Sequence, residues 1–379
     1  MRSPASKLSI LALVLVLAPW APSGRGVAAQ SAGPAPSSIG PLTFSPDGTL
    51  FVADTIGAAV YAIDLGTLSQ SASAGAKNVP ALDQRIAGLL GTDVREMVIT
   101  DLAIHPRSRN AFVSVMRGQG KAAVPVLVRV DGAGGIAVVS LQGLKFTRAA
   151  LPNPPAAADF QSPFQMDIVQ AGNEYVHKNP RVQTITDMAF VDGRLYLAGL
   201  SNEEFNSTLR SIAYPFAKVD QGANVEIYHG NHGQVETRSP VYTFVPFKIN
   251  NEAHLIAGYL CTPLVKFPLS SLKPGAKVRG TTIAELGNRN RPLDMVLYTK
   301  GGKDFLLMSN NSRGVMKIPA DTFASAAPIT SKIEVGGVPY ETIKGMKGIE
   351  QLDLLDPQHS IVLARADTGA LNLEIVPLP

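Results

Sequence analysis

The feature that most constrains the fold of this chain is a short strand–turn–strand unit that recurs along it. The stretch 186–200, TDMAFVDGRLYLAGL, contains two apolar runs joined by a tight turn. The segments 99–104 (ITDLAI) and 185–190 (ITDMAF) are near copies of each other. Apolar residues alternate with a period of two, which indicates β-strands rather than helices. The repetition predicts a ring of similar sheets and not a layered α/β domain.

Six copies of the unit can be aligned, with first strands that begin near residues 41, 101, 187, 241, 294 and 351. Repeats of roughly 40–60 residues with three or four strands each are typical of β-propeller blades. The segment Leu82–Leu90, with Asp83 as its N-cap, predicts one short helix between the first two copies. The Pro- and Ala-rich segment 146–181 is interpreted as an insertion, or as a degenerate seventh blade. We therefore expect an all-β propeller of six blades, or seven, as a single domain over residues 39–379.

One blade carries a motif with known relatives. The turn Ser45-Pro46-Asp47-Gly48 precedes a predicted strand, Thr49–Ala53, within the motif Leu50-Phe51-Val52-Ala53-Asp54. In such a turn proline presets φ and glycine accepts a positive φ. This blade resembles the repeat of NHL-type and gluconolactonase-like six-bladed propellers. The other blades resemble that repeat only loosely. The stretches 185–214 and 288–318 resemble passages of secreted bacterial proteins whose activity we cannot name. The resemblance implies a propeller fold and, more distantly, metal-dependent hydrolysis of lactones.

The N-terminal segment predicts export. Residues 1–29 combine basic Arg2 and Lys7, an apolar run and the small residues Val27-Ala28-Ala29, which is typical of a secretory signal peptide. The alternative is a membrane anchor. Residues 30–38 read as a flexible lead-in. Removing 1–29 lowers the formal net charge from +4 to +1, because the segment holds three cations and no acids. The mature chain is expected in the periplasm or outside the cell, with a small-molecule or protein partner, without nucleic acid and without stable membrane insertion.

Cysteine and tryptophan usage narrows the chemistry. Cys261 is the sole cysteine, so no intramolecular disulfide forms, and without a C-x-x-C-H motif c-type haem is excluded. We expect Cys261 to be a buried, small apolar residue. The one tryptophan, Trp20, lies in the predicted signal segment, so the mature chain has none. The large quinoprotein dehydrogenases stack a tryptophan on their cofactor, which argues against that class but not against smaller six-bladed quinoproteins.

Three aspartates hold equivalent positions in the aligned first strands. These are Asp101, Asp187 and Asp294; Pro41, Val241 and Gln351 hold the position in the other blades. Carboxylates that project toward a common axis repel each other unless a cation lies between them. Calcium or another divalent ion bound by the three aspartates is one solution. The alternative is that each aspartate accepts hydrogen bonds from backbone N–H groups of a neighbouring blade.

Loops of two kinds are expected on one face of the ring. The leading loop before each first strand and the loop between second and third strands both lie at the channel mouth. His229 and His232 form an H-x-x-H pair that can ligate a metal or serve as base and polarising group; the alternative is a surface pair without such a role. Arg289 and Arg291 predict an anion site or a polar network between blades. The candidate catalytic residues are His229, His232 and Arg238; the candidate ligand-binding residues are Asn202, Glu203, Glu236, Arg289, Arg291, Asn310 and Arg313.

These patterns leave three functions open. The first is an exported binding or scaffold propeller that uses the channel mouth, since no tight catalytic motif is present. The second is a divalent-metal-dependent hydrolase or lactonase, motivated by the aspartates and the histidine pair. The third is a quinoprotein oxidoreductase.

Overall fold

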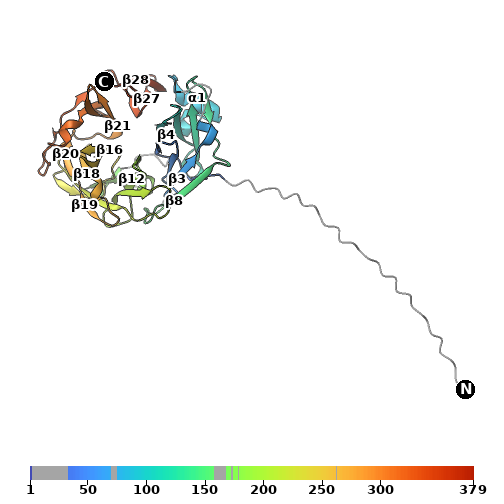
Figure 1. Cartoon of the computed structure of the whole chain (residues 1–379), viewed down its shortest axis with the longest axis horizontal. Coiled ribbons are helices and arrows are strands. Elements are labelled where there is room, and N and C mark those ends of the chain that lie inside the picture. Colours follow the sequence, from blue (N-terminus) through green and yellow to red (C-terminus); the bar gives the residue numbers. More distant parts are fainter. Residues whose placement is uncertain (2–32, 70–74, 158–167, 172–173, 178, 262) are drawn as a thin grey trace. The chain divides into compact units, whose positions relative to one another are not determined.

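The computed structural model describes residue 1 and residues 33–379, except 70–74, 158–167, 172–173, 178 and 262. The predicted signal peptide, apart from Met1, lies outside the described residues. The part that begins at residue 33 is an all-β propeller of six blades, as predicted (Figure 1). In the described part of the chain, no helix combines the length and the apolar character needed to cross a bilayer.

The first three blades, numbered in chain order, take their strands from the first two thirds of the chain. Blade 1 consists of β1 (Leu42–Phe44), β2 (Leu50–Asp54), β3 (Ala59–Asp64) and β8 (Lys145–Ala150). Blade 2 consists of β4 (Met97–Ile104), β5 (Ala111–Arg117), β6 (Val124–Val130) and β7 (Ile136–Val138). Blade 3 consists of β11 (Asp187–Val191), β12 (Arg194–Leu200), β13 (Ser207–Ala213), β14 (Ala223–His229) and β15 (Gln234–Glu236), with β19 (Lys277–Arg279) beside β14.

The remaining three blades are formed within residues 243–377. Blade 4 consists of β16 (Thr243–Ile249), β17 (Glu252–Gly258), β18 (Pro263–Pro268), β20 (Thr281–Glu285) and β24 (Gly336–Gly337). Blade 5 consists of β21 (Pro292–Lys300), β22 (Lys303–Asn310), β23 (Gly314–Pro319) and β25 (Glu341–Thr342). Blade 6 consists of β26 (Ile349–Leu354), β27 (His359–Arg365) and β28 (Leu371–Pro377). A separate hairpin pairs β9 (Ile168–Ala171) with β10 (Glu174–His177).

The order of the blades around the ring differs from their order in the chain. The innermost strand of blade 1, β1, contacts both β4 of blade 2 and β11 of blade 3, while β4 also contacts β26 of blade 6. The ring therefore runs 2–1–3–4–5–6 and closes from blade 6 to blade 2, as the labels in Figure 1 show. After blade 2 the chain returns to blade 1, where β8 pairs antiparallel with β3, and only then reaches blade 3.

The segment between blades 1 and 2 closes the ring against blade 6. Val79 exchanges backbone hydrogen bonds of 2.8 and 3.0 Å with Leu373 of β28, so it extends the outer edge of that blade. Helix α1 (Leu82–Leu90) follows at the predicted bounds, and Leu82 and Ile86 pack against blades 2 and 6. Its N-cap is Ala81 and not Asp83, which lies in the first turn.

The second strand of each blade is buried on both faces. All five residues of β2 are buried, and so are the last six of β12. This strand lies between its own blade partners and the neighbouring blades, so it reads as a continuous apolar run and not as an alternation. The first strands are less completely buried: in β26 only Ile349 and Leu352 are buried, and its other residues are partly exposed.

Two segments differ from expectation. Residues 146–150, the first part of the predicted insertion, belong to β8. The composition of this segment does not reveal a strand, but the free edge of β3 supplies its backbone partners. The end of the lead-in is also held in place. The N–H groups of Ser37 and Ser38 donate to the Asp54 carboxylate at 2.8 and 2.9 Å, so this segment is anchored where flexibility was expected.

Candidate functional site

Aspartates on the first strands connect neighbouring blades. Asp187 accepts the N–H of Phe244 in blade 4 at 2.7 Å and that of Met188 at 2.7 Å. Asp101 accepts the N–H of Leu42 in blade 1 at 2.6 Å. A first strand is the inner edge of its sheet, so its outward N–H groups need acceptors from outside the sheet. The carboxylates provide these acceptors, which is the alternative role named above for the aspartates.

The same bond recurs further around the ring. Asp294 accepts the N–H of Leu352 in blade 6 at 2.8 Å. Asp353, which the sequence alignment missed, accepts the N–H of Ile104 in blade 2 at 2.7 Å. All four carboxylates reach the next blade in the same rotational direction. In blade 4 the equivalent position holds Thr243, two residues after the Val241 that the alignment placed there, because Phe244 is the residue bonded to Asp187.

The aspartates converge on the channel. Burial raises the pKa of Asp187 to about 7 and that of Asp353 to about 6. Burial and then repulsion from neighbouring aspartates raise the pKa of Asp101 and Asp294 well above the usual range. The amide of Gln351, in the orientation that satisfies its hydrogen bonds, donates to Asp294 at 3.0 Å and to Asp101 at 2.9 Å. The metal role predicted for Asp101, Asp187 and Asp294 stays a prediction.

The aspartates line one cavity, and a second one lies at the mouth. The four carboxylates line a channel cavity of about 510 Å³ together with apolar residues of the first strands. A smaller cavity of about 220 Å³, here called the mouth cavity, lies where the first strands begin. Each blade contributes to the mouth cavity; in ring order its lining includes Thr100, Pro41, Gln183, Tyr242, Arg291 and Gln351.

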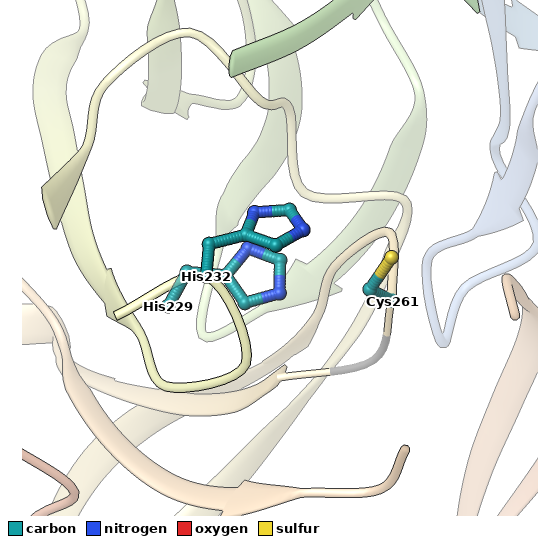
Figure 2. Close-up of side chains that lie close together, drawn as sticks. All are labelled: His229, His232 and Cys261. Atoms are coloured by element: carbon teal, nitrogen blue, oxygen red, sulfur yellow. The ribbon is translucent and has the colours of Figure 1, made fainter. Parts of the chain in front are cut away.

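A cluster of two histidines and a cysteine lies on the same face. His229 ends β14, His232 lies in the turn before β15, and Cys261 lies in the turn between β17 and β18. One ligand atom from each of the three lies within 4.8 Å of the others, so the group can hold a metal ion. The imidazole rings lie with their centroids 3.8 Å apart and their planes tilted by 33°, and Figure 2 shows Cys261 on the adjacent turn.

A buried carboxylate orients both imidazoles. Nδ1 of His229 lies 2.9 Å from one oxygen of Glu236, and Nδ1 of His232 lies 2.5 Å from the other. Burial opposes the ionisation of Glu236, but the bonds from both histidines outweigh it and lower its pKa to about 2. Bonding to Cys261 and then to Glu236 raises the pKa of His232 to about 10. Nearby, burial raises the pKa of Glu285 to about 8 even though it accepts the N–H of Gly230 at 2.6 Å.

The structure distributes the other predicted site residues over separate places. Arg238 is exposed and follows β15, and Arg289 is exposed in the leading loop of blade 5. Asn310 donates to Asn290 of that loop at 2.7 Å, and Arg313 donates to the Asn288 carbonyl at 3.2 Å. The loop after β12 turns instead toward the segment before the β9–β10 hairpin: Asn202 donates its N–H to the Asn153 carbonyl, and Glu203 accepts from the Asn153 amide.

Sequence reasoning missed one member of the cluster. Cys261 was expected to be buried, but it is only partly buried and adopts a positive φ of 60° in its turn. The signal was available, since Cys261 lies between the second and third strands of blade 4 and such loops were expected at the mouth. His254 of β17 is not part of the group.

Comparisons with known proteins assign no family. No known family and no curated protein matches the sequence. Among solved structures, the chain is similar to the PQQ-bound aldose sugar dehydrogenase of Streptomyces coelicolor (11% identity, covering 91% of this chain and 96% of that chain, TM-score 0.34). It is also similar to a putative glucose dehydrogenase of Thermus thermophilus (12%, 92% and 98%, TM-score 0.32) and to a chain of the mitotic checkpoint complex (9%, 98% and 100%, TM-score 0.36). At these identities and TM-scores the likeness assigns no activity to this chain.

Proposed function

We propose that this chain is an exported binding propeller that takes a small anionic ligand in the mouth cavity. The observation that carries the proposal is the convergence of all six blades on this one cavity of about 220 Å³. Pockets for drug-sized ligands occupy about 300–1,000 Å³, so the volume fits a ligand of only a few heavy atoms. Export follows from the signal-like residues 1–29 and is tested by the N-terminal sequence of the mature protein.

The lining favours an anion with hydroxyl or carboxylate groups. Arg291 contributes a guanidinium, whose planar fork suits carboxylate or phosphate oxygens. Tyr242 and Gln183 face each other at 3.2 Å between the hydroxyl and the amide nitrogen, so they can share a bound oxygen. The hydroxyl groups of Thr55, Thr100 and Thr186 line the same cavity.

Calorimetric titration with small mono- and dicarboxylates and with inorganic phosphate tests this function. We expect Arg291→Gln to weaken the best ligand of the panel by ~10–100-fold, since hydrogen bonds to charged groups contribute about 1.5–3 kcal/mol. Arg289→Gln is the matched control, because it removes the same charge from the same loop but not from the cavity lining. Equal affinities for the two variants, or no binding by the wild type, would contradict the proposal.

A metal-dependent hydrolase is the second candidate, and the group His229, His232 and Cys261 favours it. An ion there would polarise a carbonyl or activate a water molecule at the mouth. Hydrolysis of a lactone panel that disappears with chelator and returns with metal would support this activity. Wild-type protein loaded with metal and inactive on the panel would exclude the lactonase. The quinoprotein alternative stays a prediction.

A further inference from the structure

We propose that His229, His232 and Cys261 bind one zinc-like divalent ion at the seam between blades 3 and 4. The proposal concerns this cluster alone and does not depend on the ligand of the mouth cavity. It also differs in place and chemistry from the calcium site predicted for the aspartates.

The first argument is the unused nitrogen of His229. Nδ1 of this ring is engaged by Glu236, and the side chain is only 3% exposed. Its Nε2 is buried and has no hydrogen-bond partner. A buried polar atom without a partner costs about 1–3 kcal/mol, so its presence in a folded core calls for an explanation. A metal ion bound to Nε2 supplies one.

The second argument is the way in which the carboxylate holds the rings. In protein metal sites a ligating histidine usually donates its other N–H to a carboxylate, which fixes the tautomer and the ring orientation. Here one buried carboxylate does this for two histidines, with one oxygen for each Nδ1. Gln234 donates to the Glu236 oxygen shared with His232 at 3.3 Å and helps to fix it. The Nε2 atom of His229 is therefore left for a ligand, and the ring of His232 is held beside Cys261.

The third argument is the chemistry of the donor set. Two imidazoles and a thiolate suit Zn²⁺ and other borderline or soft ions, whereas Ca²⁺ and Mg²⁺ require mostly oxygen ligands. Tetrahedral Zn²⁺ with bonds of ~2.0–2.3 Å places its ligand atoms ~3.3–3.7 Å apart. The three ligand atoms already lie within 4.8 Å of one another, so modest side-chain rotations complete the site. Binding releases the thiol proton of Cys261 to solvent, and no redox step is involved.

The position of the cluster gives the ion a structural consequence. The histidines belong to the β14–β15 hairpin of blade 3, and Cys261 belongs to the β17–β18 turn of blade 4. The Cys261 N–H donates to the Asn290 carbonyl at 2.8 Å, next to Arg291 of the mouth cavity. An ion at this point ties two blades together beside the mouth. Three protein ligands leave a fourth position for water or a ligand group.

Metal analysis of the purified full chain after dialysis tests the proposal, with Zn²⁺ and Co²⁺ as probes. We expect one zinc per chain that excess Ca²⁺ and Mg²⁺ do not displace. Co²⁺ should give the thiolate-to-metal charge-transfer band that a cysteine ligand produces. Cys261→Ser changes one atom of a partly exposed turn, so the fold should survive. This variant should lose the band and bind zinc more weakly than the wild type.

Two further variants separate the cluster from adventitious binding. Glu236→Gln should weaken zinc binding by ~10–100-fold, because it disturbs the orientation of both rings. His254→Gln is the matched control; it alters a buried histidine of β17 outside the cluster and should leave zinc affinity unchanged. Wild type that holds no zinc, a Co²⁺ complex without the thiolate band, or equal affinity in Cys261→Ser and wild type would each overturn the proposal.

Discussion

Replacing Asp187 with asparagine should change the pH dependence of stability in a defined direction. Burial raises the pKa of Asp187 from 3.8 to about 7 in the folded chain, although two backbone N–H groups favour its charged form. A carboxyl group with a raised folded pKa contributes most to stability below its unfolded pKa. That contribution is lost as the pH rises toward the folded value. Stability from Asp187 should therefore fall between about pH 4 and pH 7, and asparagine removes this dependence.

The size of the effect follows from the two pKa values. With 1.36 kcal/mol per pKa unit, the cost of Asp187 is roughly 2 kcal/mol at pH 5 and roughly 4 kcal/mol at pH 8. The free energy of unfolding of Asp187→Asn, relative to wild type, should thus rise by roughly 2–3 kcal/mol from pH 5 to pH 8. The hydrogen bond that asparagine loses lowers stability at both pH values. Removing the charge also lowers the pKa of Asp101 and Asp294, which adds to the trend.

Urea denaturation of both proteins at pH 5 and pH 8 measures this difference, provided that the slopes with denaturant agree. Asp367→Asn is the control, since Asp367 is exposed and does not line the channel cavity. For this control, the free energy of unfolding relative to wild type should change little between pH 5 and pH 8. If Asp187→Asn and wild type lose stability in parallel from pH 5 to pH 8, then Asp187 does not titrate as a buried group and the reasoning is wrong.

Two further predictions concern the backbone and are checked by thermal or urea denaturation. Gly348→Ala should destabilise by about 1–3 kcal/mol or more, because φ is +64° and an added Cβ would overlap the Arg365 carbonyl oxygen. Gly301 has φ +60° with open space around it, so Gly301→Ala should destabilise the fold less than Gly348→Ala. Equal losses of stability in the two variants would contradict the clash at Gly348. Val79→Pro removes the N–H that closes the ring on blade 6 and should cost about 3 kcal/mol. Val79→Ala isolates the lost packing, so equal effects of the two variants would show that the hydrogen bond is unimportant.

The sequence predicted the blades well because each one is a local structure. The helix α1 lies at its predicted bounds, and β26 begins within two residues of the predicted start near 351, because alternation and turn residues act within a few positions. The order of the blades could not be predicted in the same way. It depends on the pairing of 145–150 with β3 and of Val79 with Leu373, which are contacts between segments far apart in sequence.

Blade topology predicted the face on which the candidate site lies, but not all of its residues. The leading loops do meet at a mouth, and Arg291 lines its cavity, because blade topology brings these loops together. The alignment missed Asp353 because it compared one position per strand and took Gln351 for blade 6. The topology placed the loop of Cys261 at the mouth, but the contact between Cys261 and the histidines of the neighbouring blade is formed only in the folded ring.

The channel aspartates and the histidine pair with Glu236 have different structural roles. The aspartates are expensive to bury, yet each one accepts backbone N–H groups that an inner strand cannot satisfy within its sheet, so the fold itself accounts for them. The histidine pair has no such duty, because Glu236 is its partner on one side and His229 keeps a buried nitrogen without any. A buried carboxylate that holds two imidazole rings in place is an arrangement that folding alone does not require. That difference is the physical reason for placing the metal chemistry at the seam between blades 3 and 4.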